Sequence, residues 1–303
     1  MNRRSWMQFI VVGIVWGFPY LFIRIVIREL TPETMIFFRC AITLVALLPL
    51  AMHQRRLDLV LQHWFAIVTY TIVEIAIPWY LLARAEARVP SSVAGLLIAT
   101  VPVFGLILAV VFRTEQRVST IRIVGLLIGL GGVIVTIGID IHGASAFSVI
   151  EIMICSFGYA LGPMIFNQYL LDIPPVTVIT SSFAVGTAIY LPFGLLNLPS
   201  HVSLETVMSV FALALVCSVT GFILFFRLIS DVGPARATVV TYLNPVVAVI
   251  AGVLVLGEPF SNGLALGLPL VIIGSILATW ASAHERSQNA DRNRIVSNLR
   301  TPG

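Results

Sequence analysis

The feature that most constrains this chain is a repeat of its own sequence at an offset of 143 residues, aligned without any gap. The offset places Trp16 on Tyr159, Pro32 on Pro175, Arg84 on Arg227, Pro102 on Pro245 and Glu115 on Glu258. Two copies of one unit therefore follow each other, and a fold for this chain must accommodate both.

The repeated unit is too apolar to fold in water. Hydrophobic residues make up 58% of the chain and charged residues only 11%, whereas soluble domains carry about 25% charged residues. Roughly 20 apolar residues span a bilayer as a helix. The apolar runs predict ten spans, at 8–27, 33–51, 63–83, 90–112, 119–139, 147–170, 175–196, 204–226, 234–256 and 261–283.

Five spans per copy is an odd number, so the second copy enters the bilayer from the opposite side. The predicted fold is an all-α integral membrane protein with ten transmembrane helices in two inverted five-helix repeats, at 1–139 and 147–283. Inverted repeats are common in transporters, which bind substrate between the halves near the midplane. The polar segment 284–303 is predicted to be a disordered cytoplasmic tail.

Arginine placement predicts the orientation, because basic residues gather on the cytoplasmic side. With the N-terminus inside, the cytoplasmic side holds Arg3, Arg4, Arg55, Arg56, Arg113, Arg117, Arg122, Arg227, Arg236, Arg286, Arg292, Arg294 and Arg300. The outer side holds Arg24, Arg28, Arg84 and Arg88. We therefore expect a multi-pass protein of the cell (inner) membrane with both termini cytoplasmic.

Composition also excludes several functions. The 18 basic residues are all arginine, so Schiff-base lysines and phosphate-loop lysines are excluded. A nucleic-acid partner is not expected, because a basic footprint needs a solvated face. Cys40, Cys155 and Cys217 lie in separate apolar runs without a metal-binding pattern. We expect no metal and no cofactor; the lipid bilayer and a small-molecule substrate are the expected partners, and the oligomeric state is left open.

Two ionisable residues, Arg39 and Glu74, lie well inside predicted spans, where charge is costly and usually functional. At 1.5 Å per residue their depths differ by about 5 Å, which an arginine side chain can cover. We expect them to form a buried charge pair or to share a polar cavity. A fixed ion pair that only joins two helices is an equally good interpretation.

The surroundings of Glu74 favour a cavity. Tyr70, Glu74 and Pro78 are spaced four residues apart and share one helix face. Pro78 removes the hydrogen bond to the carbonyl of residue 74 and can kink the helix there. Trp79 follows directly, and it could instead belong to the aromatic belt at the membrane surface.

Helix breakers at mid-span mark the other candidate residues. Gly17 and Pro19 stand beside Trp16 and Tyr20 in span one; the matched stretch in span six carries Tyr159, Pro163 and Asn167; span nine carries Tyr242 and Asn244 before Pro245. Broken helices are tolerated where they line a cavity. The predicted substrate-binding residues are therefore Trp16, Tyr20, Glu74, Trp79, Tyr159, Asn167, Tyr242 and Asn244. Kinking and packing alone are the alternative.

Other motifs have structural interpretations. Glu115 and Glu258 follow spans four and nine and could cap the next helix. The pairs Gly125/Gly129 and Gly263/Gly267 predict close helix packing in spans five and ten.

The chain resembles the EamA-type branch of the drug/metabolite transporter superfamily over about residues 8–283. The resemblance rests on Trp16-Gly17, Phe38-Arg39, Pro102 with Glu115, Pro245 with Gly257-Glu258-Pro259, and Gly131-Gly132 with Gly274. It departs from the family at Arg24, where lysine is common, and at Arg113-Thr114-Glu115, which lacks the Gly-Glu turn. The resemblance implies a central cavity and movement of amino acids, related metabolites or drugs across a bacterial membrane.

The predicted function is secondary transport, most simply export, by alternating access of the two halves. Direct use of ATP is not expected, since no nucleotide-binding motif is present. A membrane-embedded enzyme would need clustered His, Asp, Glu or Ser near an interface, and the sequence shows only single residues. A non-transporting membrane protein is the remaining alternative.

Overall fold

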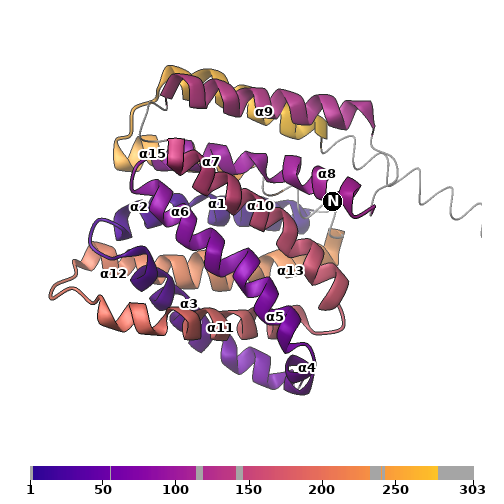
Figure 1. Cartoon of the computed structure of the whole chain (residues 1–303), viewed down its shortest axis with the longest axis vertical. Helices are drawn as coiled ribbons and strands as arrows, with labels where there is room; N and C mark the ends of the chain where they lie inside the picture. The colour runs from indigo at the N-terminus through magenta and orange to yellow at the C-terminus, as the bar shows by residue number, and fades with distance from the viewer. Residues whose placement is uncertain are drawn as a thin grey trace, which may run out of the picture.

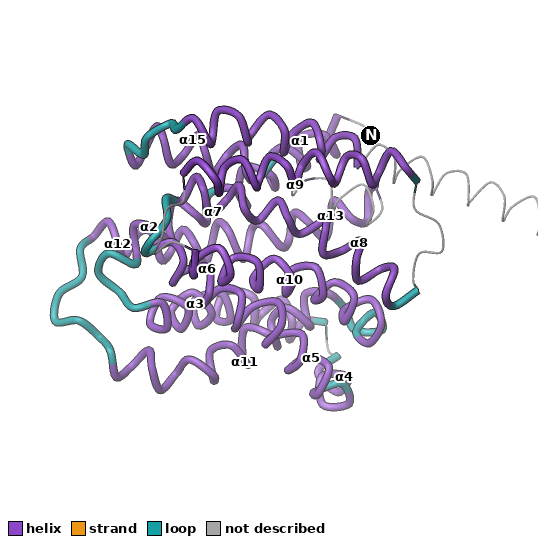
Figure 2. The backbone as a smooth tube through the Cα atoms, turned by 45° about the horizontal axis from the view of Figure 1, so that its top comes forward, coloured by secondary structure: helices purple, strands orange, loops and turns teal. Residues whose placement is uncertain are grey.

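A computed structural model describes residues 3–54, 56–113, 119–140, 146–232, 240 and 243–278. Throughout this part of the chain the regular structure is helical, and the helices are joined by short loops (Figure 2). Tyr242, Glu115 and the tail 284–303 lie outside the described residues, so the predictions made for them stay predictions.

The first half contains the following elements (Figure 1): α1 (Arg3–Gly17), α2 (Pro19–Val26), α3 (Pro32–His53), α4 (Leu57–Gln62), α5 (Trp64–Thr71), the π-helix η1 (Ile72–Ala76), α6 (Ile77–Glu86), α7 (Ser91–Leu97), the 3₁₀ turn η2 (Ile98–Thr100), α8 (Val101–Val111) and α9 (Thr120–Asp140). The second half contains α10 (Ala146–Tyr169), α11 (Pro175–Leu196), α12 (Leu204–Phe211), the π-helix η4 (Ala212–Thr220), α13 (Gly221–Val232), α15 (Asn244–Leu256) and the helix Asn262–Ala278.

Eight helical stretches of the described chain are long and apolar enough to cross a membrane. They are Arg3–Val26, Pro32–His53, Trp64–Glu86, Ser91–Val111, Thr120–Ile139, Ala146–Tyr169, Pro175–Leu196 and Leu204–Ile229. Two shorter apolar helices, Asn244–Leu256 and Asn262–Ala278, occupy the places expected for spans nine and ten. Large apolar side chains such as Leu196, 82% exposed, face outward, as a lipid-facing surface requires. The all-helical membrane fold is confirmed.

The repeat reappears in the helix bounds. Arg3–Val26 and Ala146–Tyr169 are offset by 143 residues at both ends, and so are α3 and α11. Pro32 and Pro175 each stand in the first turn of their helix, where a missing N–H is harmless. The same local signals therefore start equivalent helices in both halves.

Equivalent helices pack on each other in opposite directions. Gln54, after the end of α3, accepts a hydrogen bond from Thr177 at the start of α11 (2.8 Å). Gly194, near the end of α11, lies against Phe37 near the start of α3. The two helices are therefore antiparallel, although their sequences are matched in the same direction.

The last helices of the two halves pair in the same way along one edge of the molecule (Figure 1). Gly125 of α9 meets Gly274, and Gly132 meets Gly267, so closely that a Cβ on either α9 glycine would collide with the partner backbone. The Thr136 hydroxyl lies 3.1 Å from the carbonyl of Gly263. Close packing through glycines occurs here as predicted.

The remaining main contacts also join the two halves, with α10 against α6, α1 against α13, and α7 against α15. Exchanging the halves by the offset converts the first of these contacts into the second. The core therefore lies between the halves rather than inside either one, and it includes the centre of span three.

Candidate functional site

The candidate site lies where span three of the first half meets span six of the second half. Tyr159 of α10 is within electrostatic range of Tyr20, Glu74 and Arg39. These four residues come from α10, α2, η1 and α3, so tertiary packing brings together polar groups from both halves.

Glu74 lies on the π-helix η1, one turn before Pro78. Pro78 cannot donate to the carbonyl of residue 74, and the ladder widens at this point. The Oε2 atom of Glu74 is buried and has no hydrogen-bond partner among the described residues. π-Bulges are frequent at functional sites, and here the bulge carries an unsatisfied carboxylate.

The space for that carboxylate comes from two glycines on α10. A Cβ on Gly162 would lie 2.9 Å from the carboxyl carbon of Glu74, with the Oε2 atom closer still. A Cβ on Gly158 would lie 2.8 Å from the Pro78 ring and would collide with the Val73 carbonyl. Glycine at both positions lets α10 lie directly on the distorted part of span three.

Arg39 reaches a different set of partners. Its Nε donates to the Ser218 hydroxyl (3.1 Å), and its guanidinium carbon lies 3.5 Å from the centroid of the Trp79 ring. The side chain is buried at 6% exposure. A hydrogen bond and a cation–π contact therefore hold the guanidinium in place.

The structure does not form the predicted ion pair between Arg39 and Glu74. Arg39 turns toward η4 and Trp79, and Glu74 turns toward Gly162. The matched depth of the two residues is a correct reading of the sequence, but depth does not define which way a side chain points. Their sharing of one polar cavity stays a prediction.

Trp16 stands at the equivalent place in the other half. Its indole N–H donates to the carbonyl oxygen of Cys217 (3.2 Å), which lies in the π-helix η4. Its ring packs on Phe225 and Phe222, with centroids 4.6 and 5.7 Å away, and Gly221 provides room for the indole. Trp16 thus contacts span eight as α10 contacts span three.

The two candidate asparagines are less closely placed. Asn244 begins α15 next to the break in span one, since a Cβ on Gly17 would lie 3.3 Å from the Asn244 carbonyl oxygen. Its Oδ1 atom is buried without a described partner. Asn167 is exposed near the end of α10, about 12 Å along the helix from Tyr159. The structure therefore does not bring Asn167 to the Tyr159 group.

Two of the predicted helix interruptions differ from expectation. Span one is broken between α1 and α2 as expected, but α10 continues through Pro163. In span four the ladder changes at η2, just before Pro102. Neighbouring side chains and packing can carry a proline inside a membrane helix, so a proline alone does not locate a break.

Glu258 caps a helix of the other half rather than the next helix in its own. Its carboxylate accepts the backbone N–H groups of Ser91 (2.7 Å) and Ser92 (3.0 Å), at the start of α7. A negative charge at a helix N-terminus is stabilising. The expectation of a cap is right and the expected partner is wrong.

Sequence reasoning missed several polar contacts at this same end of the molecule. Glu151 pairs with Arg84 (3.2 Å) and Arg88 (2.9 Å). The Glu86 side chain is fully buried, its carboxylate oxygens have no described partner, and Arg24 donates to its backbone carbonyl. A signal was available, because Glu86 ends an apolar run that contains Arg84.

Glu29 joins the same end from the first connecting loop. Its carboxylate accepts the Ser203 backbone N–H (2.8 Å), and this bond holds the pKa of Glu29 below its ordinary value. Glu29 is fully exposed, so the contact marks proximity of the loops rather than a large stabilisation.

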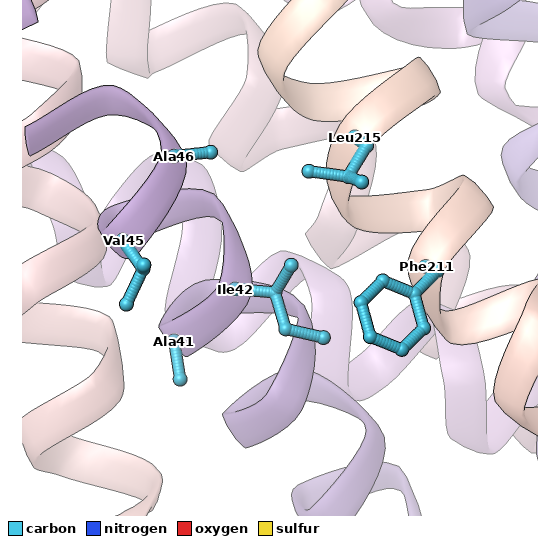
Figure 3. Close-up of a pocket in the computed structure, with 6 residues that line it drawn as sticks. All are labelled: Ala41, Ile42, Val45, Ala46, Phe211 and Leu215. Atoms are coloured by element: carbon cyan, nitrogen blue, oxygen red, sulfur yellow. The ribbon is translucent and has the colours of Figure 1, made fainter.

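A separate groove of about 380 Å³ lies between α3 and the α12–η4 helix (Figure 3). It is lined by Ala41, Ile42, Val45, Ala46, Phe211 and Leu215. These side chains are all apolar, so the groove cannot orient a polar substrate. Val45 is 71% exposed, and the groove belongs to the lipid-facing surface.

Comparison with known proteins agrees with this geometry. The EamA-like transporter family matches residues 4–138 and again residues 146–280. The uncharacterized inner membrane transporter YedA of Escherichia coli (strain K12) is 29% identical over 272 residues, covering 88% of this chain and 87% of that protein. A probable terminal-alkyne amino-acid exporter of Streptantibioticus cattleyicolor is 27% identical over 234 residues, covering 74% and 72%.

A solved crystal structure shares the fold with a TM-score of 0.68 at 16% sequence identity, covering 92% of this chain and 98% of the other. The two family matches together include most of the sequence. The chain is therefore a multi-pass membrane protein that belongs to the EamA-like transporter family.

Proposed function

We propose that the protein is a secondary transporter that exports amino acids or related small metabolites or drugs by alternating access of two inverted five-helix repeats. The observation that carries the proposal is the unpaired charge of Glu74 and Arg39 at the contact between the halves. A structural staple would pair these groups, whereas a substrate site leaves them available.

The inverted arrangement is supported by the antiparallel packing of matched helices. α3 and α11 have equivalent sequences and opposite directions. An odd number of spans per half produces this relationship, and ten spans follow if Asn244–Leu256 and Asn262–Ala278 both cross the bilayer. Transporters use such pseudo-symmetry to expose one central site to the two sides in turn.

We assign the end containing Glu258, Glu151 and Glu29 to the outside, since the arginine distribution puts both termini in the cytoplasm. Contacts between the halves gather at this end, through Ser91, Ser92 and Arg88. The conformation described is then one that is closed to the outside. Export is the direction favoured by the name of the Streptantibioticus relative.

Transport from sealed vesicles tests the proposal. Purified protein in proteoliposomes, loaded with a panel of amino acids and amphipathic drugs, should release at least one compound faster than protein-free vesicles. Gly162→Leu protein is the matched control, because it blocks the candidate site without changing a charged group. Equal release by both proteins would place the transport activity elsewhere, and no release of any compound would favour a non-transporting role or the enzyme alternative.

Topology is tested separately. In a chain with Cys40, Cys155 and Cys217 replaced, His142→Cys should react with a membrane-impermeant thiol reagent added outside intact cells. Labelling only after the cytoplasmic side is opened would reverse the assignment.

A further inference from the structure

We infer that the central site binds a small zwitterion, with Glu74 holding its protonated amine and Arg39 holding its carboxylate. The inference rests on the proposed transport function and assigns the two charged ends of the substrate to two residues of the site. It is carried by the separation of two opposite buried charges, neither of which is neutralised by the other.

Glu74 provides the pole for an amine. The Oε2 atom is buried without a hydrogen-bond donor among the described residues, and leaving a buried carboxylate unsatisfied is costly. An ammonium group can supply both the charge and the hydrogen bonds that are lacking. Tyr70 and Tyr159 lie within electrostatic range of Glu74, and their aromatic faces can also attract a cation.

Arg39 provides the pole for a carboxylate. The Ser218 hydroxyl donates to the Leu213 carbonyl (3.0 Å), so its oxygen is oriented to accept from Arg39 Nε. Trp79 covers the guanidinium face. This arrangement uses Nε and the ring face and leaves the two terminal nitrogens, which form the fork that binds a carboxylate in a bidentate manner.

The two poles can act on one ligand because Tyr159 lies within electrostatic range of both. Trp79 and Phe183, with ring centroids 6.0 Å apart, supply an apolar wall beside the Arg39 pole. A ligand with a single charge would satisfy one pole and leave the other buried charge uncompensated. The site should therefore reject a lone amine and a lone acid of the same shape.

The experiment uses L-phenylalanine with two compounds that each lack one charge, phenethylamine and hydrocinnamate, in counterflow assays on the full-length protein in proteoliposomes. Export of the zwitterion should exceed that of either analogue by about tenfold or more, the size of one lost charge-assisted contact. Binding is measured in parallel by quenching of tryptophan fluorescence, since Trp79 lies against Arg39.

Two substitutions separate the poles. Glu74→Gln should lower phenylalanine transport about tenfold and shift preference toward hydrocinnamate, while Arg39→Gln should shift it toward phenethylamine. Glu29→Gln makes the same chemical change as Glu74→Gln in an exposed loop and should transport at the unmodified rate. Size-exclusion profiles and the fluorescence assay identify any variant that has lost its fold, and Glu74→Asp then serves as the variant that keeps the charge.

The outcomes are distinguishable. Transport of phenethylamine or hydrocinnamate as fast as phenylalanine, or unchanged preference in Glu74→Gln and Arg39→Gln, would overturn the two-pole inference and leave the transport function standing. Failure to transport or bind all three compounds, with another class of compound exported, would overturn it as well. Failure with every compound of the wider panel would overturn the proposed function itself.

Discussion

The two π-helices of this protein occupy the same position in the repeat but carry different chemistry. η1 covers Ile72–Ala76, and the offset of 143 places those residues at 215–219, inside η4 (Ala212–Thr220). Glu74 in η1 corresponds to Cys217 in η4. Each π-helix is contacted by an aromatic-bearing helix of the other half, through Tyr159 on one side and Trp16 on the other.

The comparison separates architecture from function. The widened ladder is present twice, even though Pro78 has a glycine, Gly221, as its counterpart, so packing between the halves maintains it. The charge is present once. Arg39 also has an uncharged counterpart, Ser182, which is buried and bonds to its own helix at Val178 (2.9 Å). The first half therefore supplies both charges, while the second supplies Tyr159, Gly162 and Ser218 around them.

The largest expected effect comes from filling the space beside η1. Gly162→Leu should abolish transport, because the new side chain displaces the Glu74 carboxylate, and overpacking costs about 1–3 kcal/mol of stability. Gly131→Leu is the control, since a Cβ at Gly131 has open space around it. Vesicle efflux and thermal unfolding of both variants measure the difference. Normal transport by Gly162→Leu would remove η1 from the site.

The next prediction concerns the sign of a stability change. Glu74→Met should raise the free energy of unfolding by about 1–3 kcal/mol while abolishing transport, because it removes a buried carboxylate without a described partner. Cys217→Ser, at the matched position, should lower it, because it puts a hydroxyl in place of a buried thiol. Denaturant titration in detergent measures both. If Glu74→Met is destabilised, then Glu74 has a stabilising partner.

A smaller effect is expected at the other π-helix. Trp16→Phe keeps the ring contacts with Phe225 but removes the donor to the Cys217 carbonyl, at a cost of about 1 kcal/mol. Transport should fall only a few-fold, because no charged pole is lost. A loss as large as that of Gly162→Leu would show that the two π-helices contribute equally to the site.

The smallest quantity expected is the coupling between the two charges. In a double-mutant cycle of Arg39→Ala and Glu74→Ala, the effects on stability should add within about 0.5 kcal/mol, because the two residues have separate partners. Strong coupling, with the double variant more stable than either single variant, would restore the direct ion pair predicted from their matched depth.

Prediction from the sequence worked best where the signal is local or periodic. Hydropathy located the spans within a few residues, except that the first begins earlier, at Arg3. The glycine pairs of spans five and ten indicated close packing correctly. Glu74 stood out because a carboxylate inside an apolar run is costly wherever the run is placed.

Prediction failed where the partner is distant in the chain. Glu258 lies 167 residues from the Ser91 amide that it caps, and Ser218 lies 179 residues from Arg39. Neither distance leaves a local pattern. Glu86 was overlooked for the same reason, since its burial depends on how the ends of α2 and α7 cover it.

The amino-acid sequence by itself determined that this chain crosses a membrane many times and is built from two matched halves, because hydropathy and the offset of 143 residues are properties of the chain alone. The tertiary structure decided which groups meet at the centre. Side-chain direction is set by the packing of α10 on η1 and of α3 beside η4, and this packing leaves Arg39 and Glu74 apart, each held by partners from the other half.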